Sequence, residues 1–518
     1  MKSKVVLTIA ALVLLGVKEM RAQVPSFASE ALFLSRTQPG GTARILGMGG
    51  SQTALGGDIS SASSNPAGLG MYNRSEFSFT PGYTMTSSAS SYLGNTDNQS
   101  KNTLIIPNLG MAFHKGKEGT TGFLGGTFGV SYNRISDYNN TFTYHGKNND
   151  NSIIDYFLNN ADGDTEAQFD SNINSPGYNY NTPTGLAYNN YLIGPETAIN
   201  PGGDPTRYFT DVYPYLPTQT EVVKTTGSQG QWNFSYGANF SDKFFVGLGI
   251  GLASFKYKSE ALYTETFLDP FPSATPPVSP MSKLVLNESF NMTGTGINAT
   301  LGAIFRPLDL VQFGFSIATP TSYQISSEYI ASMNTTWQNF EYTPGTILNN
   351  VSYKTDLVSF QHNLSTPWKF NGGFAFFIVK KAIITGNVEY VSYGSSTYSG
   401  YSDGSSSNLD NQNIKNLYKD VFNLRLGGEF RLNNYRFRVG GSVMPDPYKT
   451  LQNDVSVDYY SGSIGFGYRT SDFYIDLAGI YGWTSNSYRP YNVPSNTSPL
   501  VTMKNQSTTI AFTVGFPF

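Results

Sequence analysis

Few residues of this chain could carry out covalent or redox chemistry. Its 518 residues include three histidines, His114, His145 and His362, and no cysteine. A hydrolase would need a nucleophile such as serine beside a base that a third group orients, and each histidine is isolated in sequence from such partners. The lack of cysteine excludes disulfides and thiolate metal sites. We therefore expect no enzyme, no cofactor and no metal site.

Two weaker hypotheses stay open, namely that the chain binds haem or that it binds calcium. Haem needs an axial ligand such as His or Tyr, and His145 or the many tyrosines could supply one. The run Asn160–Ala–Asp162–Gly–Asp164–Thr–Glu166 clusters oxygen ligands but lacks the spacing of an EF-hand loop, so a calcium-stabilised loop is a minor alternative. Gly47–Met48–Gly49–Gly50 is a poor dinucleotide fingerprint, because no strand precedes it.

Strands of alternating polarity are the elements that would position any functional residue. Between positions 421 and 432, apolar residues such as Phe422 and Leu424 alternate with polar ones such as Arg425 and Glu429. Such a period of two is typical of a strand with two different faces. We expect the charged residues to point into a wet lumen. The sequence predicts about fourteen strands, near 75–86, 103–114, 122–135, 229–240, 243–257, 286–306, 309–330, 365–378, 381–395, 421–432, 435–444, 459–470, 473–484 and 507–518.

The connectors between these strands alternate between short and long. Short turns are expected at 241–242, 307–308, 379–380, 433–434 and 471–472. Long connectors are expected at 136–228, 258–285, 331–364 and 396–420. The stretch 258–285 is apolar and Pro-rich, whereas 136–228 and 396–420 are polar. Outer-membrane barrels have this asymmetry, with short periplasmic turns and long outer loops. The pattern predicts an all-β fold, a transmembrane antiparallel barrel of about fourteen strands in the outer membrane of a Gram-negative bacterium.

Composition agrees with a barrel. Only 13% of residues are charged, whereas 14% are aromatic. Past the first residues, no run approaches the about 20 apolar residues of a spanning helix. The formal net charge of −3 gives no basic surface for a nucleic acid.

Both ends of the chain carry expected targeting features. Lys2 and Lys4 precede an apolar run from Val5 to Val17, which is typical of a secretory signal peptide over residues 1–22, with cleavage after Ala22. The final strand ends in Phe518. We expect that terminal aromatic residue to be read by the barrel-assembly machinery as a partner.

Residues 23–74 precede the first strand and hold the most specific motif. This segment resembles the N-terminal hatch of the FadL/TodX family of outer-membrane transporters. The resemblance rests on Ala43-Arg44, Gly47–Gly50, Asp58 and Asn65-Pro66-Ala67-Gly68-Leu69. Two weaker matches to the same family lie in predicted strands, at Thr366-Pro367-Trp368-Lys369 and at Arg425-Leu426-Gly427-Gly428-Glu429. The sequence is most similar to the branch from Bacteroidetes-type bacteria whose members are sometimes labelled hemin receptors.

The resemblance implies a barrel over residues 75–518 that is plugged by the 23–74 hatch. It implies passive uptake of long-chain fatty acids or other hydrophobic molecules, with loop capture, a lumen pocket and sideways exit through a kinked third strand. On this chain Asn65, Pro66, Ala67 and Gly68 become the gating residues. Gly125 and Gly126 become the exit candidates, because paired glycines can bend a strand, although they could equally face a crowded hatch.

The apolar residues Leu262, Phe267 and Phe271 are candidates for ligand capture, although they could instead only pack the loops together. The expected partners are a hydrophobic ligand and outer-membrane lipid, and we expect a monomer. A non-transport barrel, serving as a scaffold or a secretion-system component, is the alternative, because one fold hosts many functions.

Overall fold

The wall of the molecule is built from long antiparallel strands, and the computed structural model describes residues 26–169, 180–212, 216–267, 279–378, 381–494 and 498–518. The strands are β1 (Glu76–Tyr92), β2 (Asn95–Gly116), β3 (Phe123–Asp137), β4 (Asn140–Lys147), β7 (Thr218–Phe240), β8 (Phe244–Thr266), β9 (Met281–Leu308), β10 (Val311–Ala318), β11 (Ser322–Thr343), β12 (Thr346–Lys354), β13 (Val358–Ser365), β14 (Lys369–Ile378), β15 (Ala382–Ser392), β16 (Thr397–Ser399), β17 (Asp420–Leu432), β18 (Tyr435–Met444), β19 (Tyr459–Arg469), β20 (Tyr474–Tyr488) and β21 (Val501–Pro517). The predicted leader, residues 1–22, and the turn at 379–380 lie outside the described residues.

The wall closes on itself. β1 pairs antiparallel with β2 on one side and with β21 on the other, so that Glu76 lies opposite Pro517. Across the described residues this gives a closed barrel of 14 antiparallel strands, and the predicted fold class is confirmed. Closure leaves the wall without an edge strand.

Three wall strands are each made of two pieces. β3 and β4 follow one another along β7, and β10 and β11 follow one another along β9. β14 and β13 likewise continue along β10 and β11. Two of the breaks contain Pro320 and Pro367, which cannot donate a ladder hydrogen bond. The predicted strand 309–330 is therefore two strands.

Several strands extend well beyond their predicted ends on the side of the long loops. β1 and β2 continue to a two-residue turn at Leu93 and Gly94, both with positive φ, where a long polar connector was expected. β8 and β9 likewise run into the expected loop 258–285. In β1 and β2, serine, threonine and asparagine fill the extensions, which lack the apolar alternation of the membrane part. The extensions of β8 and β9 keep buried apolar residues such as Tyr263 and Leu284.

An apolar girdle surrounds the outside of the barrel. On β8 the outward residues Phe244, Val246, Leu248, Ile250 and Leu252 are all exposed, while the residues between them face inward. Such a band is what a bilayer requires of a transmembrane barrel. Arg425, Glu429 and Arg438 are buried inside, which confirms their predicted lumen-facing phase.

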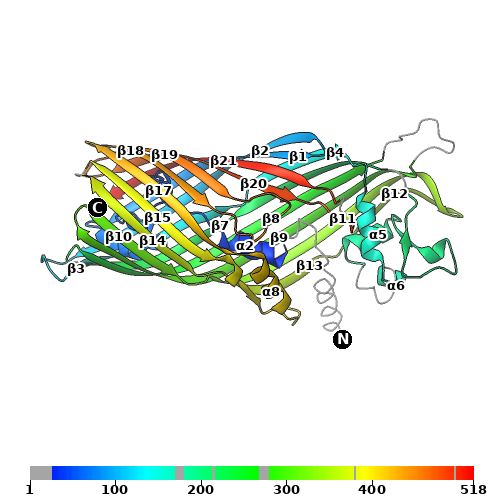
Figure 1. Ribbon diagram of the computed structural model, residues 1–518, viewed down its shortest axis with the longest axis horizontal. Coiled ribbons are helices and arrows are strands. Elements are labelled where there is room, and N and C mark those ends of the chain that lie inside the picture. Colours follow the sequence, from blue (N-terminus) through cyan, green and yellow to red (C-terminus); the bar gives the residue numbers. More distant parts are fainter. Residues whose placement is uncertain (1–25, 170–179, 213–215, 268–278, 379–380, 495–497) are drawn as a thin grey trace.

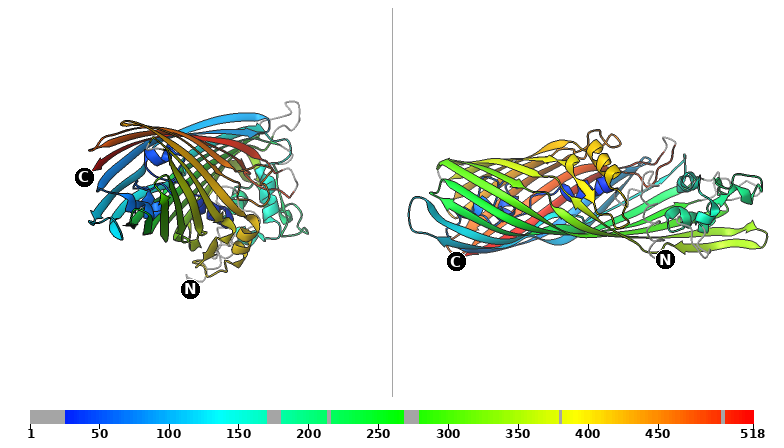
Figure 2. Two further views of the ribbon diagram at one scale, coloured as in Figure 1. Left: turned by 60° about the vertical axis from the view of Figure 1, so that its left-hand side comes forward. Right: turned by 90° about the horizontal axis from the view of Figure 1, so that it is seen from below.

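The helices lie in two groups. The hatch, residues 26–74, contains α2 (Phe27–Ser35), α3 (Ala43–Leu46), α4 (Ser61–Ser64) and the 3-10 helix η1 (Pro66–Met71). It lies inside the barrel, as both views in Figure 2 show. The outer connectors hold α5 (Ile153–Ala161), α6 (Glu166–Phe169), α7 (Pro183–Asn189) and α8 (Asn408–Leu417), with short elements β5 (Gly194–Pro195), η2 (Glu196–Ala198), β6 (Tyr208–Phe209) and η3 (Tyr393–Ser395).

The two ends of the barrel differ. The C-terminus and the short hairpins share one end, the short-turn end, whereas α5, α6 and the β11–β12 hairpin stand at the other, the loop end (Figure 1). None of the described helices is both long and apolar enough to cross a bilayer.

Candidate functional site: a hatch and the cavity beside it

The motif Asn65–Gly68 seats the hatch against the wall. Asn65 caps η1, because its Oδ1 accepts a hydrogen bond from Ala67 N at 3.2 Å. Its Nδ2 donates to the Thr53 carbonyl at 2.6 Å and to the Ala303 carbonyl of β9 at 3.3 Å. Pro66 occupies the first turn of η1, where a missing N–H costs nothing. One buried amide therefore joins two parts of the hatch to the barrel.

Inward-facing glycines of the wall receive this motif. A Cβ at Gly237 would lie 2.5 Å from the Pro66 carbonyl oxygen and 2.6 Å from Gly70 N. Cβ atoms at Gly247 and Gly302 would collide with Pro66 and with Asn65. Hatch backbone thus touches wall backbone, which only glycine permits. The sequence interpretation missed these wall glycines; glycine in the inward phase of a strand was the available signal.

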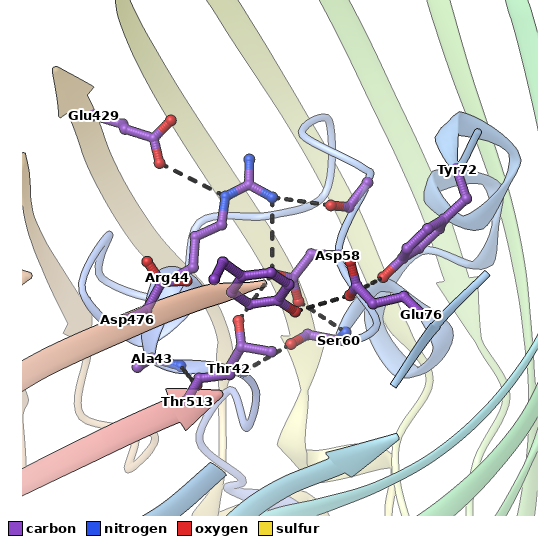
Figure 3. A network of polar contacts seen from close by, with 12 residues as sticks. Thr42, Ala43, Arg44, Asp58, Ser60, Tyr72, Glu76, Glu429, Asp476 and Thr513 are labelled. Carbon is purple, nitrogen blue, oxygen red and sulfur yellow. Dashed lines mark hydrogen bonds and ion pairs between the residues drawn. The ribbon is translucent and has the colours of Figure 1, made fainter. Parts of the chain in front are cut away.

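A buried ion network ties the opposite side of the hatch to β17, β18 and β20. Arg44 of α3 lies 3.7 Å from Asp58 of the hatch and 3.7 Å from Glu429 of β17 (Figure 3). Glu429 accepts from Arg438 at 2.8 Å, and Arg438 donates to Asp476 at 2.6 Å. Since removing one member would leave an uncompensated buried charge, the network fixes the hatch in one position.

Backbone N–H groups of the hatch also donate hydrogen bonds to the wall. The Ala43 N–H donates to Thr513 Oγ1 of β21 at 2.8 Å, and the Gly49 N–H donates to Ser463 Oγ of β19 at 3.1 Å. Within the hatch, Asp58 accepts from the Thr42 hydroxyl at 2.9 Å and from Ser60 N at 3.0 Å (Figure 3). The hatch is therefore a folded plug with contacts to opposite sides of the wall.

A cavity of about 140 Å³ lies between the hatch and the wall. Hatch segments at Leu34–Gly40 and Gly50–Thr53 form one side. Two of the three broken wall strands border it at their breaks, because it is lined by Thr319 and Thr321 between β10 and β11 and by Thr366 and Pro367 between β13 and β14. A ligand inside this cavity would contact the two parts of the wall where the ladder is interrupted.

The cavity has a polar and positively charged side. Lys369 of β14 donates to Thr37 Oγ1 of the hatch at 2.6 Å. Arg425 lies 3.1 Å from Glu389, whose carboxylate also accepts from Asn423 at 2.8 Å. Two cations therefore face one carboxylate. Lys369 and Arg425 stand in the two weaker sequence matches, but sequence reasoning did not group them as a site.

Polar atoms without protein partners also line the cavity. In the described part of the chain, Gln52 Oε1, Asn387 Oδ1 and Arg425 Nε are buried without a hydrogen-bond partner. Buried polar groups normally find partners. The lining can therefore accept further hydrogen bonds from a bound molecule or from water.

The cavity reaches β3 at a bulge. The β3–β7 register shifts between Arg134 and Ser136, and Ile135 between them lines the cavity and accepts a hydrogen bond from hatch Gln38 N at 2.9 Å. Gly125 marks another register shift and has a φ of +140°. It lies near the short-turn end, and neither Gly125 nor Gly126 is among the residues that line the cavity.

The predicted capture residues are not brought together. Leu262 lies on the outward face of β8 with 43% of its surface exposed. Phe267 is 2% exposed, inside an apolar cluster. Phe271 lies outside the described residues.

That cluster fills the mouth of the barrel at the loop end. α5 contributes Ile153 and Phe157, and the inner faces of β9 and β11 contribute Leu284 and Met333. α5 begins with a capping box made by Ser152 and Asp155. Ser152 Oγ and Ile153 N also donate to the Glu265 carboxylate of β8, at 2.5 Å and 2.8 Å. α5 and α7 thus form a lid on the apolar inner wall.

The remaining singled-out residues have structural partners. His114 Nδ1 lies 3.0 Å from Thr127 Oγ1, and His145 Nδ1 lies 2.7 Å from Asp97 Oδ2. His362 Nε2 lies 2.7 Å from Glu30 of α2, both buried. The acidic run 160–166 joins no cluster of three metal-ligating side chains in the described residues, and Glu166 accepts from Tyr188 at 2.6 Å.

Comparisons with known proteins identify the fold. No protein-family model and no curated protein sequence matches the chain. A solved FadL homologue from Pseudomonas aeruginosa superposes with a TM-score of 0.52 and 13% identity, over 93% of this chain and 99% of that one. The Pseudomonas putida toluene transporter TodX gives 0.51 and 12%, over 93% and 99%. The fold implied by the resemblance to the FadL/TodX family is confirmed.

Proposed function

We propose that this chain is an outer-membrane transporter that takes up hydrophobic small molecules by passive diffusion. The observation that carries the proposal is the cavity between the hatch and the broken part of the barrel wall. The apolar girdle supports a membrane location. A cavity beside a plug gives a ligand a binding place on the way across, and the fold shared with a toluene transporter supports this class of cargo.

Within this class we propose an amphipathic anion such as a long-chain fatty acid. Lys369 and Arg425 face the cavity, and Glu389 is the one carboxylate among the described residues that line it. A carboxylate would be held by charge-assisted hydrogen bonds there. A neutral aromatic hydrocarbon would form no ion pair with Lys369 or Arg425. The excess of positive charge in the cavity therefore favours a carboxylic acid as the ligand.

The proposed route has three stages. The ligand is captured at the loop end, passes into the cavity and leaves sideways when the hatch shifts around Asn65–Gly68. The Ile135 bulge supports an exit through β3 at that point, because the bulge borders the cavity. An exit at Gly125–Gly126 stays a prediction from the sequence.

Uptake of radiolabelled oleate and toluene by a deletion strain, complemented with the full chain, tests the proposal. We expect the Lys369→Gln/Arg425→Gln variant to lower oleate uptake about a hundredfold or more, because each of the two lost charged hydrogen bonds contributes about 1.5–3 kcal/mol, and to leave toluene uptake unchanged. Lys449→Gln, an exposed loop substitution, is the control. Uptake of a panel of hydrophobic compounds that deletion leaves unaltered would overturn the proposal.

A non-transport role as a scaffold or secretion-system component is the second candidate. The β11–β12 hairpin stands at the loop end of the barrel (Figure 1), and Ile347 on it is 61% exposed. Exposed apolar side chains of this kind can mark a protein contact. A stable partner in pull-downs that is lost in Ile347→Asp, with no retained lipid by mass spectrometry, would favour this role.

A further inference from the structure

Three lysines lie together on the outer face of the barrel, above the apolar girdle. Lys256 and Lys258 follow the outward residue Leu252 along β8 at intervals of two residues, and Lys224 on β7 lies opposite Glu260 of the same face. Residues two apart on a strand share a face. These three side chains, called the lysine patch below, therefore point away from the lumen.

The lysine patch begins near the height of the lipid headgroup layer and extends outward from it. Leu252 is the last apolar outward residue of β8 before Ser254. Four residues of strand span about 13 Å, so Lys256 lies about 10 Å above Leu252 along the barrel axis at a tilt of about 40°. By the same measure Lys258 lies about 15 Å above it, and Lys224, which is opposite Glu260, about 20 Å. A headgroup region adds about 5–8 Å beyond the hydrocarbon, and flexible lysine stems can bend toward it.

The patch has uncompensated positive charge. Lys258 is paired with Glu260 at 2.5 Å, and the nearby Asp137 is paired with Arg134 at 2.7 Å. In the described residues neither Lys224 nor Lys256 has a carboxylate within ion-pair distance.

Apart from Glu260, which lies opposite Lys224 and is paired with Lys258, the nearest neighbours of the patch on β9 and β2 are neutral or basic. The outward residues of β9 that pair with Lys256 and Lys258 are Thr293 and Asn291. Lys101 of β2 donates to the Thr225 carbonyl beside Lys224 at 2.8 Å, which adds positive charge.

We infer that the lysine patch binds the phosphate groups of anionic glycolipids in the outer leaflet. The inference rests on the membrane location in the proposed function. Lysine is a compact donor to phosphate oxygens, and the girdle directly below the patch would hold the acyl chains of the same lipid. The bound group is thus a lipid headgroup and not free phosphate, because only a lipid satisfies both the charged and the apolar surface.

Binding to the detergent-purified full chain tests this inference. The probes are lipopolysaccharide, the same lipid after enzymatic dephosphorylation, and inorganic phosphate, each measured by native mass spectrometry and by the shift in Tm. We expect Lys224→Gln/Lys256→Gln/Lys258→Gln to weaken lipopolysaccharide binding by roughly twentyfold or more, since each lysine near an anionic surface contributes about fivefold.

The matched control carries the same change at three other exposed lysines, Lys147→Gln/Lys283→Gln/Lys354→Gln, and should bind as the unaltered chain does. Heat-modifiable gel migration confirms that both variants are closed barrels. Equal binding of dephosphorylated lipid, stabilisation by inorganic phosphate alone, or a patch variant that binds normally would overturn the inference. A patch variant that loses lipid but still takes up oleate separates this inference from the proposed transport.

Discussion

At the scale of single residues, inward-facing glycines of the wall leave the space that the hatch occupies. The glycines that face the Asn65–Gly68 motif leave no space for a side chain, whereas a Cβ at Gly372 of β14 would meet nothing within 4 Å. The same residue type therefore meets the hatch at an inward position and open space at Gly372, which lies in the outward phase of β14 between Phe370 and Phe374.

We expect Gly237→Ala to displace the hatch. The added methyl group would overlap the Pro66 carbonyl and Gly70 N, and such overpacking costs about 1–3 kcal/mol. Single-channel conductance in planar bilayers should rise from near zero to frequent openings. Gly372→Ala is the control and should stay closed; equal conductance of the two variants would contradict the role of Gly237.

A second residue-scale prediction concerns the lid and its pH dependence. Glu265 lies above the girdle, and burial raises the pKa of its carboxyl above the usual range, against the hydrogen bonds that lower it. A raised pKa in the folded state means that the stabilisation is complete below the unfolded pKa and is lost as pH rises through the folded one.

Hydrogen exchange at α5 measures that loss. Protection of α5 should fall between pH 4 and pH 8 in the unaltered chain and should change little in Glu265→Gln, which cannot ionise. A pH dependence that persists unchanged in the Gln variant would assign the effect to another group.

At the scale of elements, the lid covers the surface that a hydrophobic ligand would meet first. α7 ends beside β11, where Asn190 Oδ1 and Thr335 Oγ1 are 3.4 Å apart. The apolar cluster beneath contains Met281 and Met333, whose flexible side chains adapt to different neighbours. A ligand that reached this surface would replace the lid helices.

A disulfide between lid and wall tests that exchange. The chain has no cysteine, so Asn190→Cys/Thr335→Cys introduces a single possible crosslink. We expect oxidation to lower oleate uptake about tenfold or more and a reductant to restore it. The control is Asn190→Cys alone, whose oleate uptake should change with neither the oxidant nor the reductant. If the oxidised double variant takes up oleate at the normal rate, the lid need not move during uptake.

At the scale of the whole molecule, the wall was predictable and the contacts across the lumen were not. The alternation around Phe422 and Arg425 is local, so a period of two locates both faces of β17. The extensions of β1 and β2 escaped prediction because Ser87–Ser91 pairs through backbone bonds without an apolar face. The cavity joins Thr37, Lys369 and Arg425, which are far apart in sequence, so no local pattern indicates it.

The pairing of β1 with β21 also sets an order of events during biogenesis. Of the described strands, the one that completes the ring stands last in the chain, whereas the hatch stands before β1. The plug is available while the wall is still an open sheet, and its contacts with β7, β9, β17 and β21 can form as that sheet curls. The hatch can thus serve as the template around which the barrel is built, in addition to being the stopper that it later becomes.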